Sequence, residues 1–257
     1  MRRLILVFAT SLLLLLLPTS AGAITGGQVD SENDYPFVGL LAFYDEDGGY
    51  MHRCTGTLVS PTVVLTASHC TDGAASAYAY FQITVPDDFR DNPTGLAGTP
   101  HTHPDYNPNT LANDVGVVVL EDPVTLPEYP TIASEGFLSD LKATHEIKDD
   151  VFVAAGYGGV TAFPPNIINF DLIRRFSQSP YGGLTRNSLH LQGNPNATGM
   201  GGTCFGDSGG PHFWEDTLVI VSVTSWGDAI CRSNDMTQRV DIASVLEFLA
   251  DWGITPA

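Results

Sequence analysis

The sequence predicts an all-β protein, a barrel or a sandwich, with one helix near its C-terminus. Short apolar or alternating runs recur along the chain, and clusters of Gly, Pro, Asp and Asn separate them. Helical spacing of apolar residues is visible only in residues 242–252. With 257 residues, 43% of them hydrophobic and 16% charged, the chain can bury a large core. This composition excludes disordered and collagen-like chains.

The expected strands follow in chain order. The turn 45–49 after the first of them is rich in Asp and Gly and indicates a hairpin. Segments 87–113 and 163–169 are rich in Pro, Gly, Asn and Asp, so we expect surface loops there. In the helix, Val245, Leu246, Leu249 and Trp252 share one face. The expected strands cover residues 37–44, 55–59, 62–67, 77–85, 115–120, 151–155, 188–192, 218–226 and 236–240.

Residues 1–23 have the pattern of a secretory signal peptide. Arg2 and Arg3 precede an apolar run over residues 4–17, and the small residues Ala21-Gly22-Ala23 follow. The alternative is an uncleaved membrane anchor, but a bilayer span takes about 20 apolar residues. We therefore expect an exported, extracellular protein without membrane association. Its single folded domain would cover residues 24–257.

The charge balance restricts the partners. The chain has 29 Asp and Glu against 11 Lys and Arg, and its formal net charge is −18. Nucleic-acid-binding surfaces are built from Lys and Arg, so nucleic acid is not an expected partner. The acidity serves solubility, or it indicates a preference for cationic substrates.

The four cysteines all follow the predicted leader. They are Cys54, Cys70, Cys204 and Cys231. An even number in an exported chain favours two disulfides, and spacing alone leaves three pairings open. A zinc site is the alternative, but the chain has no Cys-x-x-Cys pair.

Three segments carry the residue types of nucleophilic catalysis. Residues 206–211 read Gly-Asp-Ser-Gly-Gly-Pro, in which glycines leave backbone N–H groups accessible around Ser208. His69 follows an apolar run and precedes Cys70, so it is a candidate general base. Asp114 opens a very apolar run and could orient that base. Each segment alone also fits an ordinary turn, a structural histidine or a capping aspartate.

Taken together, these segments resemble the trypsin/chymotrypsin family of serine proteases over residues 24–257, in the order His, Asp, Ser. The resemblance implies two packed six-stranded antiparallel Greek-key β-barrels with a C-terminal α-helix. It implies a secreted serine endopeptidase that acts through a Ser-His-Asp triad and an acyl-enzyme intermediate. Protein or peptide substrates, and protein protease inhibitors, would be its partners. A monomer with no cofactor and no metal is expected.

The resemblance also assigns roles around the triad. The N–H groups of Gly206 and Ser208 would form the oxyanion hole. A new α-amino group on Ile24 would pair with Asp207 and order that hole. The implied disulfides are Cys54–Cys70 and Cys204–Cys231. Because the predicted leader ends directly before Ile24, export itself would activate the enzyme.

Substrate-binding residues are likewise implied. Ser225, Trp226 and Gly227 would pair with the substrate backbone as an added strand. Gly202, followed by Thr203, stands where members with basic specificity carry Asp. Counting back from residues 239–240 places Asp235, or else Asn234, on the opposite pocket wall. We expect broad or mixed specificity with Arg and Lys accepted.

Two other classes of function stay open. An α/β-hydrolase esterase also shows Gly-x-Ser-x-Gly, but it needs its histidine well after the serine, and the only later one is His212. A catalytically inactive protease homologue could act as a binding protein. Solvated turns are the simpler explanation of the acidic stretches 45–47 and 87–88, although calcium is an alternative there.

Overall fold

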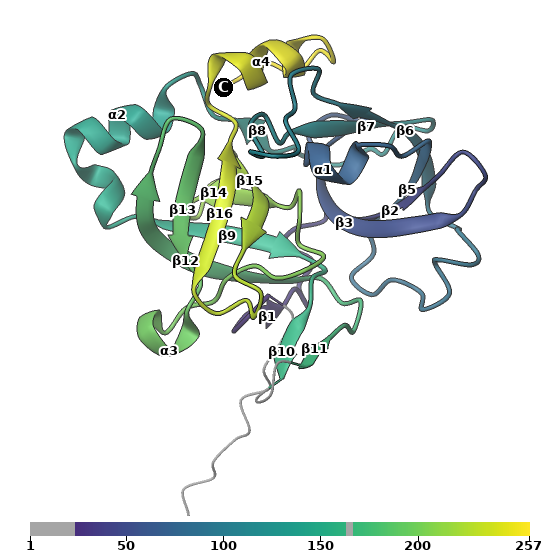
Figure 1. Cartoon of the computed structure of the whole chain (residues 1–257), viewed down its shortest axis with the longest axis horizontal. Coiled ribbons are helices and arrows are strands. Elements are labelled where there is room, and N and C mark those ends of the chain that lie inside the picture. Colours follow the sequence, from purple (N-terminus) through teal and green to yellow (C-terminus); the bar gives the residue numbers. More distant parts are fainter. Residues whose placement is uncertain (1–23, 163–166) are drawn as a thin grey trace, which may run out of the picture.

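The computed structural model describes residues 24–162 and 167–257. The predicted signal peptide lies outside these residues. Two β-barrels lie side by side, and the chain passes from the first to the second near its middle (Figure 1). The predicted all-β fold of two six-stranded barrels with a C-terminal helix is confirmed.

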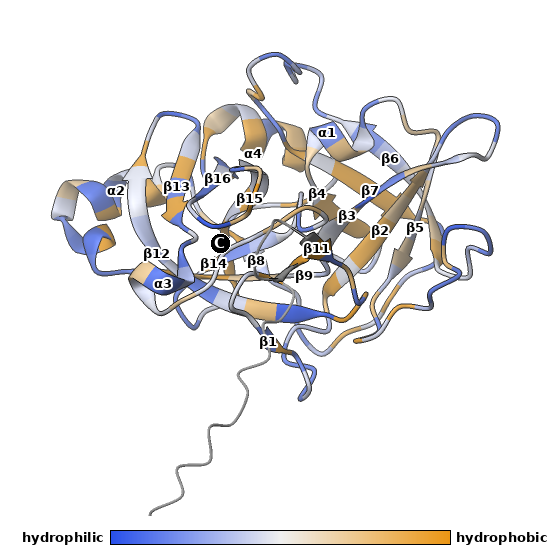
Figure 2. Ribbon diagram, turned by 60° about the horizontal axis from the view of Figure 1, so that its bottom comes forward, coloured by the Kyte–Doolittle hydropathy of each residue, from blue (hydrophilic) through white to orange (hydrophobic). Residues whose placement is uncertain are grey.

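The first barrel is antiparallel throughout and closes in the strand order β2-β3-β4-β7-β6-β5. Closure leaves no exposed strand edge and encloses one apolar interior. Every residue of β2 is buried, and β2, β4 and β7 are mainly apolar in Figure 2. The strands are β2 (Val38–Tyr44), β3 (Tyr50–Leu58), β4 (Val63–Thr66), β5 (Ser76–Tyr80), β6 (Leu96–Thr102) and β7 (Gly116–Leu120).

The second barrel runs in the order β12-β13-β16-β15-β14-β9, and pairing of β9 with β12 closes it. Strands β1 (Gln28–Val29) and β8 (Thr131–Ile132) extend its rim. The hairpin of β10 (Val160–Ala162) and β11 (Ile167–Asn169) stands apart from both barrels. The barrel strands are β9 (Val151–Gly156), β12 (Arg175–Leu184), β13 (Ser188–Gln192), β14 (Pro211–Trp214), β15 (Val219–Gly227) and β16 (Asn234–Arg239).

The C-terminal helix α4 (Ala243–Ala250) follows the second barrel but packs on the first. The Phe248 ring lies 4.9 Å from that of His103, and the Trp252 ring lies 4.2 Å from that of His101. The last helix thus holds the two barrels together (Figure 1). Among the described residues, no helix has the length and hydrophobicity needed to cross a bilayer. The other helical turns are α1 (Ser68–Thr71), α2 (Phe137–Thr144), η1 (Glu146–Lys148) and α3 (Pro195–Thr198).

A buried arginine also joins the barrels. Arg174, which precedes β12, is fully buried, and its Nε lies 2.7 Å from Asp30 Oδ2. The same guanidinium donates to the carbonyl oxygens of Val38 and Phe81 in the first half of the chain. A buried charge is tolerable only with such full pairing. The contact fixes the relative position of the halves that carry the site.

The loop and helix predictions need correction. Segment 87–113 contains a strand, β6, although its Pro and Gly residues are unfavourable in strands. Pairing with β5 on one side and β7 on the other stabilises it. The end of segment 163–169 forms β11. Residues 242–252 are not the only helix, because α2 starts after Gly136, whose φ of 81° starts the turn. Strands β12 and β14 were also not predicted, since their sequences lack clear alternation.

Candidate active site

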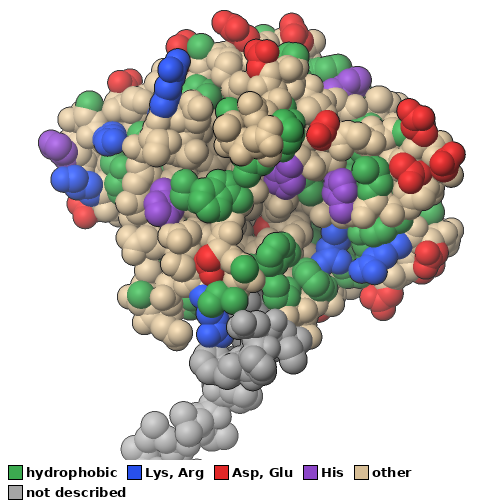
Figure 3. All heavy atoms as spheres, in the orientation of Figure 1, with side chains coloured by type: hydrophobic (Ala, Val, Ile, Leu, Met, Phe, Trp, Pro, Cys, Tyr) green, Lys and Arg blue, Asp and Glu red, His purple; other side chains and the backbone are tan. Residues whose placement is uncertain are grey.

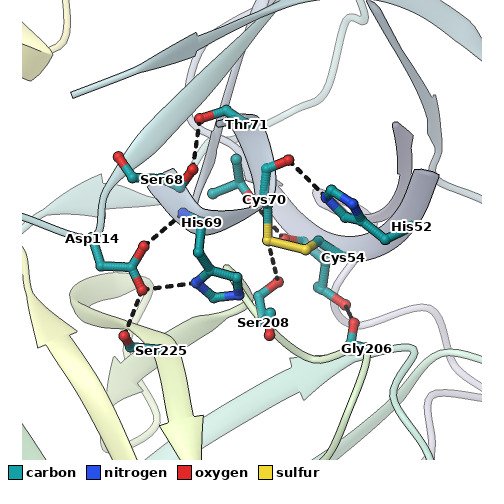
Figure 4. The surroundings of a disulfide bond; sticks show 12 residues. His52, Cys54, Ser68, His69, Cys70, Thr71, Asp114, Gly206, Ser208 and Ser225 are labelled. Atoms are coloured by element: carbon teal, nitrogen blue, oxygen red, sulfur yellow. Dashed lines mark hydrogen bonds and ion pairs between the residues drawn. A yellow bond between two sulfur atoms is a disulfide. The ribbon is translucent and has the colours of Figure 1, made fainter. Parts of the chain in front are cut away.

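The three residues predicted to carry catalysis come from both barrels. His69 lies in α1 directly after β4, and Asp114 lies just before β7. Ser208 lies in the loop between α3 and β14 of the second barrel. Figure 4 shows the His69 ring between Asp114 and Ser208. The site therefore lies between the barrels, and the contacts between the two barrels set its geometry.

Asp114 holds both the ring and the backbone of His69. Its carboxylate is fully buried; Oδ2 lies 2.8 Å from His69 Nδ1, and Oδ1 accepts the His69 backbone N–H at 2.8 Å. The Ser225 hydroxyl also donates to Oδ2. Two contacts from one carboxylate fix the ring so that Nε2 is directed away from Asp114. This is the geometry of a carboxylate that orients a general base.

The loop around Ser208 leaves two N–H groups unused. The N–H groups of Asp207, Gly209 and Gly210 donate to backbone carbonyls. Within the described residues, no hydrogen bond uses the N–H of Gly206 or Ser208. Gly206 has a φ of 97°, which favours glycine there. These two donors are the pair that sequence reasoning assigned to the oxyanion hole.

Thr55 of β3 fixes this loop, a role that sequence reasoning missed. Its hydroxyl donates to the carbonyl of Gly206 at 2.9 Å and accepts the N–H of Tyr157 at 3.2 Å. Its own N–H donates to the carbonyl of Ser208 at 2.9 Å. Both peptide carbonyls next to the unused N–H groups are thus held by one fully buried residue. No motif in the sequence marks Thr55.

Two disulfides brace the site. The Cys54–Cys70 bond joins β3 to α1, next to His69, and the Cys204–Cys231 bond joins the Ser208 loop to the segment after β15. These are the pairs that the resemblance implies. Ligand atoms of Cys54, Cys70 and His69 lie within 4.8 Å of one another, but the sulfurs are bonded to each other and offer no thiolate for zinc.

A pocket of about 280 Å³, here called the primary pocket, opens beside Ser208 and His69. Of the predicted substrate-binding residues, Thr203, Ser225, Trp226 and Gly227 line it. Beyond Thr224 no described strand occupies the edge of β15 that faces Ser208, because β14 pairs only as far as Val223. That edge can accept a further strand.

Asp235 lies beneath the primary pocket instead of in its lining. It is 1% exposed; its Oδ2 lies 3.1 Å from Nε2 of the fully buried His212 and 3.4 Å from the N–H of Thr203. Its Oδ1 has no partner among the described residues. Gly202 is also buried behind the lining, whereas Asn234 lies at the surface and contacts His190. The contact between Asp235 and His212 was not apparent from sequence.

Asp228 is a further acidic residue of the primary pocket that the sequence did not indicate. It lies in the lining itself. Burial acts to raise its pKa, but backbone N–H groups of Asn234, Arg232 and Ser233 donate to it and hold that pKa below its usual value. The carboxylate therefore stays ionised at neutral pH and adds negative charge to the pocket.

Ile24 and Asp207, the predicted activation pair, are both buried. Asp207 accepts N–H groups of Gly158 at 2.7 Å and Cys204 at 2.9 Å. Desolvation nevertheless raises its pKa to about 7. In this 257-residue chain the Ile24 nitrogen is part of a peptide bond, and Ile24 has a φ of 54°, where a β-branched residue is strained. No ion pair between the two residues occurs among the described residues.

Comparisons with known proteins agree with this geometry. The Trypsin family profile matches residues 24–249. The chain belongs to the trypsin family of serine proteases. It is 31% identical over 228 residues to a trypsin of Saccharopolyspora erythraea, covering 81% of this chain and 88% of the relative. It is 29% identical over 249 residues to brachyurin of Leptuca pugilator, covering 91% and 100%. As a family member, it is a serine-type endopeptidase.

A solved structure shares the fold. The structure described as HL collagenase superposes with a TM-score of 0.67 at 19% identity, covering 89% of this chain and 98% of the other. At this identity the likeness concerns the arrangement of the two barrels and not the substrate. The family and fold that the sequence indicated are therefore confirmed.

Proposed function

We propose that the protein hydrolyses peptide bonds through Ser208, His69 and Asp114. His69 Nε2 takes the proton of the Ser208 hydroxyl as its oxygen attacks the scissile carbonyl, and then gives that proton to the leaving amine. Asp114 orients the ring and stabilises the imidazolium. Water then attacks the acyl-enzyme through the same proton transfers and releases the acyl part of the substrate as a carboxylic acid. The observation that carries this proposal is the 2.8 Å contact of Asp114 Oδ2 with His69 Nδ1, with Ser208 in the same pocket.

The negative oxygen that forms on the scissile carbonyl would be bound by the N–H groups of Gly206 and Ser208. Such fixed donors typically contribute about 3 to 4 kcal/mol to catalysis. In this account Thr55 is a positioning residue: by holding the Gly206 and Ser208 carbonyls, it directs the two N–H groups toward the substrate.

For specificity, we propose that the primary pocket takes the side chain before the cut bond and accepts Arg and Lys alongside apolar residues. Asp228 offers negative charge in the lining, and Asp235 offers it from beneath Thr203. The apolar part of the lining explains a broad preference. His212 weakens the preference for Arg and Lys over apolar residues, because it already contacts one carboxylate oxygen of Asp235.

For maturation, we propose that removal of residues 1–23 releases the Ile24 amine and that this amine pairs with Asp207. A buried aspartate with a raised pKa and no ion-pair partner among the described residues supports this. The cut also removes the strained φ at Ile24, since a terminal residue has no preceding carbonyl. Two disulfides are consistent with an exported protein. Secretion to the extracellular space, as a monomer, remains our expectation.

Cleavage of fluorogenic peptides by protein that starts at Ile24 tests the proposal. The protein should cut peptides that carry Arg or Lys before the scissile bond, and His69→Ala should lower kcat by at least about 10⁴-fold. Full activity of His69→Ala would contradict the assignment. Binding of peptides without any cleavage would favour the inactive homologue.

A further inference from the structure

A second cavity adjoins the reacting groups and the primary pocket. It has a volume of about 480 Å³, and we call it the leaving-group cleft. His69 and Ser208 line both cavities, so a peptide lying across Ser208 enters both. If the acyl side of the substrate occupies the primary pocket, as proposed above, the residues after the cut bond must occupy the leaving-group cleft. Its other walls include Tyr50 and Arg53 of β3, with Arg90 and Phe170.

Two arginines give this cleft a charge opposite to that of the molecule. The chain has a net charge of −18, yet the leaving-group cleft contains Arg53 and Arg90 and no acidic side chain in its lining. Among the described residues, neither arginine forms an ion pair with a carboxylate. By contrast, three other buried or partly buried arginines each form an ion pair with an aspartate: Arg174, Arg175 and Arg239. On the face in Figure 3, basic side chains gather beside apolar ones toward the lower right, with acidic side chains at the outer edge of the group.

Aromatic rings hold the two guanidinium groups in place. Arg53 lies 4.1 Å from the centre of the Phe170 ring, and Arg90 lies 5.7 Å from that of Tyr50 and 5.4 Å from that of Phe89. Stacking on a ring face orients a guanidinium but uses none of its N–H donors. Apart from the buried Nε of Arg53, the donors of both arginines thus remain available to a ligand in the plane of each group.

The side chain of Arg53 lies next to Gly206, and its Nε has no hydrogen-bond partner among the described residues. A Cβ on Gly206 would lie 3.3 Å from Arg53 Nε, so the guanidinium sits next to the loop of the oxyanion hole. That Nε is buried, with no partner among the described residues. Burial is the largest influence and lowers the pKa of Arg53; Arg90 lowers it further, whereas Tyr50 and Asp207 act in the opposite direction without cancelling the effect. A bound anion would relieve both penalties.

We propose that the leaving-group cleft selects substrates with a carboxylate within the first three residues after the scissile bond. The carboxylate belongs either to an Asp or Glu side chain or to the C-terminus of the substrate, since both present the same planar pair of oxygens to a guanidinium. Arg53 and Arg90 are then specificity-determining residues. The preferred substrate has a cationic or apolar residue before the cut and an anionic group after it. This inference rests on the proposed function, which fixes the direction of the peptide.

Matched fluorogenic peptides test the inference. All carry Arg before the cut; one series has Glu or Gln at each of the three following positions, and a second series ends two residues after the cut in a free acid or an amide. We expect the Glu or acid peptide to be cut about three- to tenfold better in kcat/KM at one position, and 0.5 M salt to reduce the ratio. The ratio should fall to about 1 in Arg53→Gln/Arg90→Gln and partly persist in Arg53→Lys. It should stay unchanged in Lys142→Gln/Lys148→Gln, a control with the same charge change at two exposed lysines of α2 and η1.

Binding measurements keep the test independent of catalysis. The Ser208→Ala variant, which cannot turn over, should bind the Glu or acid peptide more tightly than its neutral partner by a similar factor. Equal cleavage and equal binding of the charged and neutral peptides at every position would overturn the inference, as would a preference that survives in the double arginine variant. Absence of cleavage with selective binding would contradict the proposed function and leave the inference supported.

Discussion

The ionisation of Asp207 should depend on whether Ile24 carries a free amine. In the uncut chain, desolvation raises the pKa of Asp207 from 3.8 to about 7. A pKa higher by about 3 corresponds to about 4 kcal/mol in the free energy of unfolding. Because the folded-state pKa lies above the unfolded one, the stabilising effect of the protonated acid is complete below pH about 4. It is lost as the pH rises to about 7.

Cleavage before Ile24 should reverse this loss. The new ammonium group, with an ordinary pKa of about 8, supplies the positive charge that the buried carboxylate lacks. At pH 7.5 the mature protein should therefore be more stable than a protein that retains Gly22 and Ala23, by up to about 4 kcal/mol. At pH 4 the two should unfold at nearly the same denaturant concentration.

Urea unfolding of the two proteins at pH 4, 5.5 and 7.5 measures this difference. Both carry Ser208→Ala, so that neither digests itself. The groups common to both proteins cancel in the comparison, and Asp207→Asn in each should remove its pH dependence. A stability difference that is constant with pH, or one that survives Asp207→Asn, would refute the pairing of Ile24 with Asp207.

Substitutions at four positions test individual contacts of the site. Asp114→Asn should lower kcat by about 10⁴-fold, because the ring of His69 loses the carboxylate that orients it. Ser225→Ala removes only one hydrogen bond to that carboxylate and should lower kcat less than about tenfold. Steady-state kinetics compares the two variants. Asp235→Asn should lower kcat/KM at least about tenfold for Arg peptides and less than about twofold for Phe peptides. Equal losses for both peptides would exclude a role of Asp235 in attracting cationic side chains to the primary pocket. Thr55→Val should lower kcat about tenfold with little change in KM, whereas Thr55→Ser should retain activity; an unchanged kcat in Thr55→Val would contradict the positioning role.

The family and the fold could be predicted because their signals are contiguous. The hexapeptide 206–211 and the residues beside His69 and Asp114 each lie within a few positions of one another. Apolar strands such as β2 and β7 are also visible, since their burial follows from their own composition. Strand β6 was missed because its pairing with β5 and β7, and not its own residues, stabilises it.

The surroundings of the site could not be predicted, because they join distant segments. Thr55 contacts the carbonyl of a residue 151 positions away, and the contact of His212 with Asp235 spans 23 positions. The primary pocket could not be predicted for the same reason. Asp228 lines it because the loop after β15 folds around its carboxylate. Arg53 and Arg90 meet only in the folded barrel. No local pattern records such contacts.

Covalent labelling by a fluorophosphonate, of protein that starts at Ile24, is the most direct test of the assignment of Ser208 as nucleophile. Peptide mapping should place a single adduct on Ser208, and the labelling rate should fall by several orders of magnitude in His69→Ala. An adduct on another serine, or equal labelling of His69→Ala, would contradict the account.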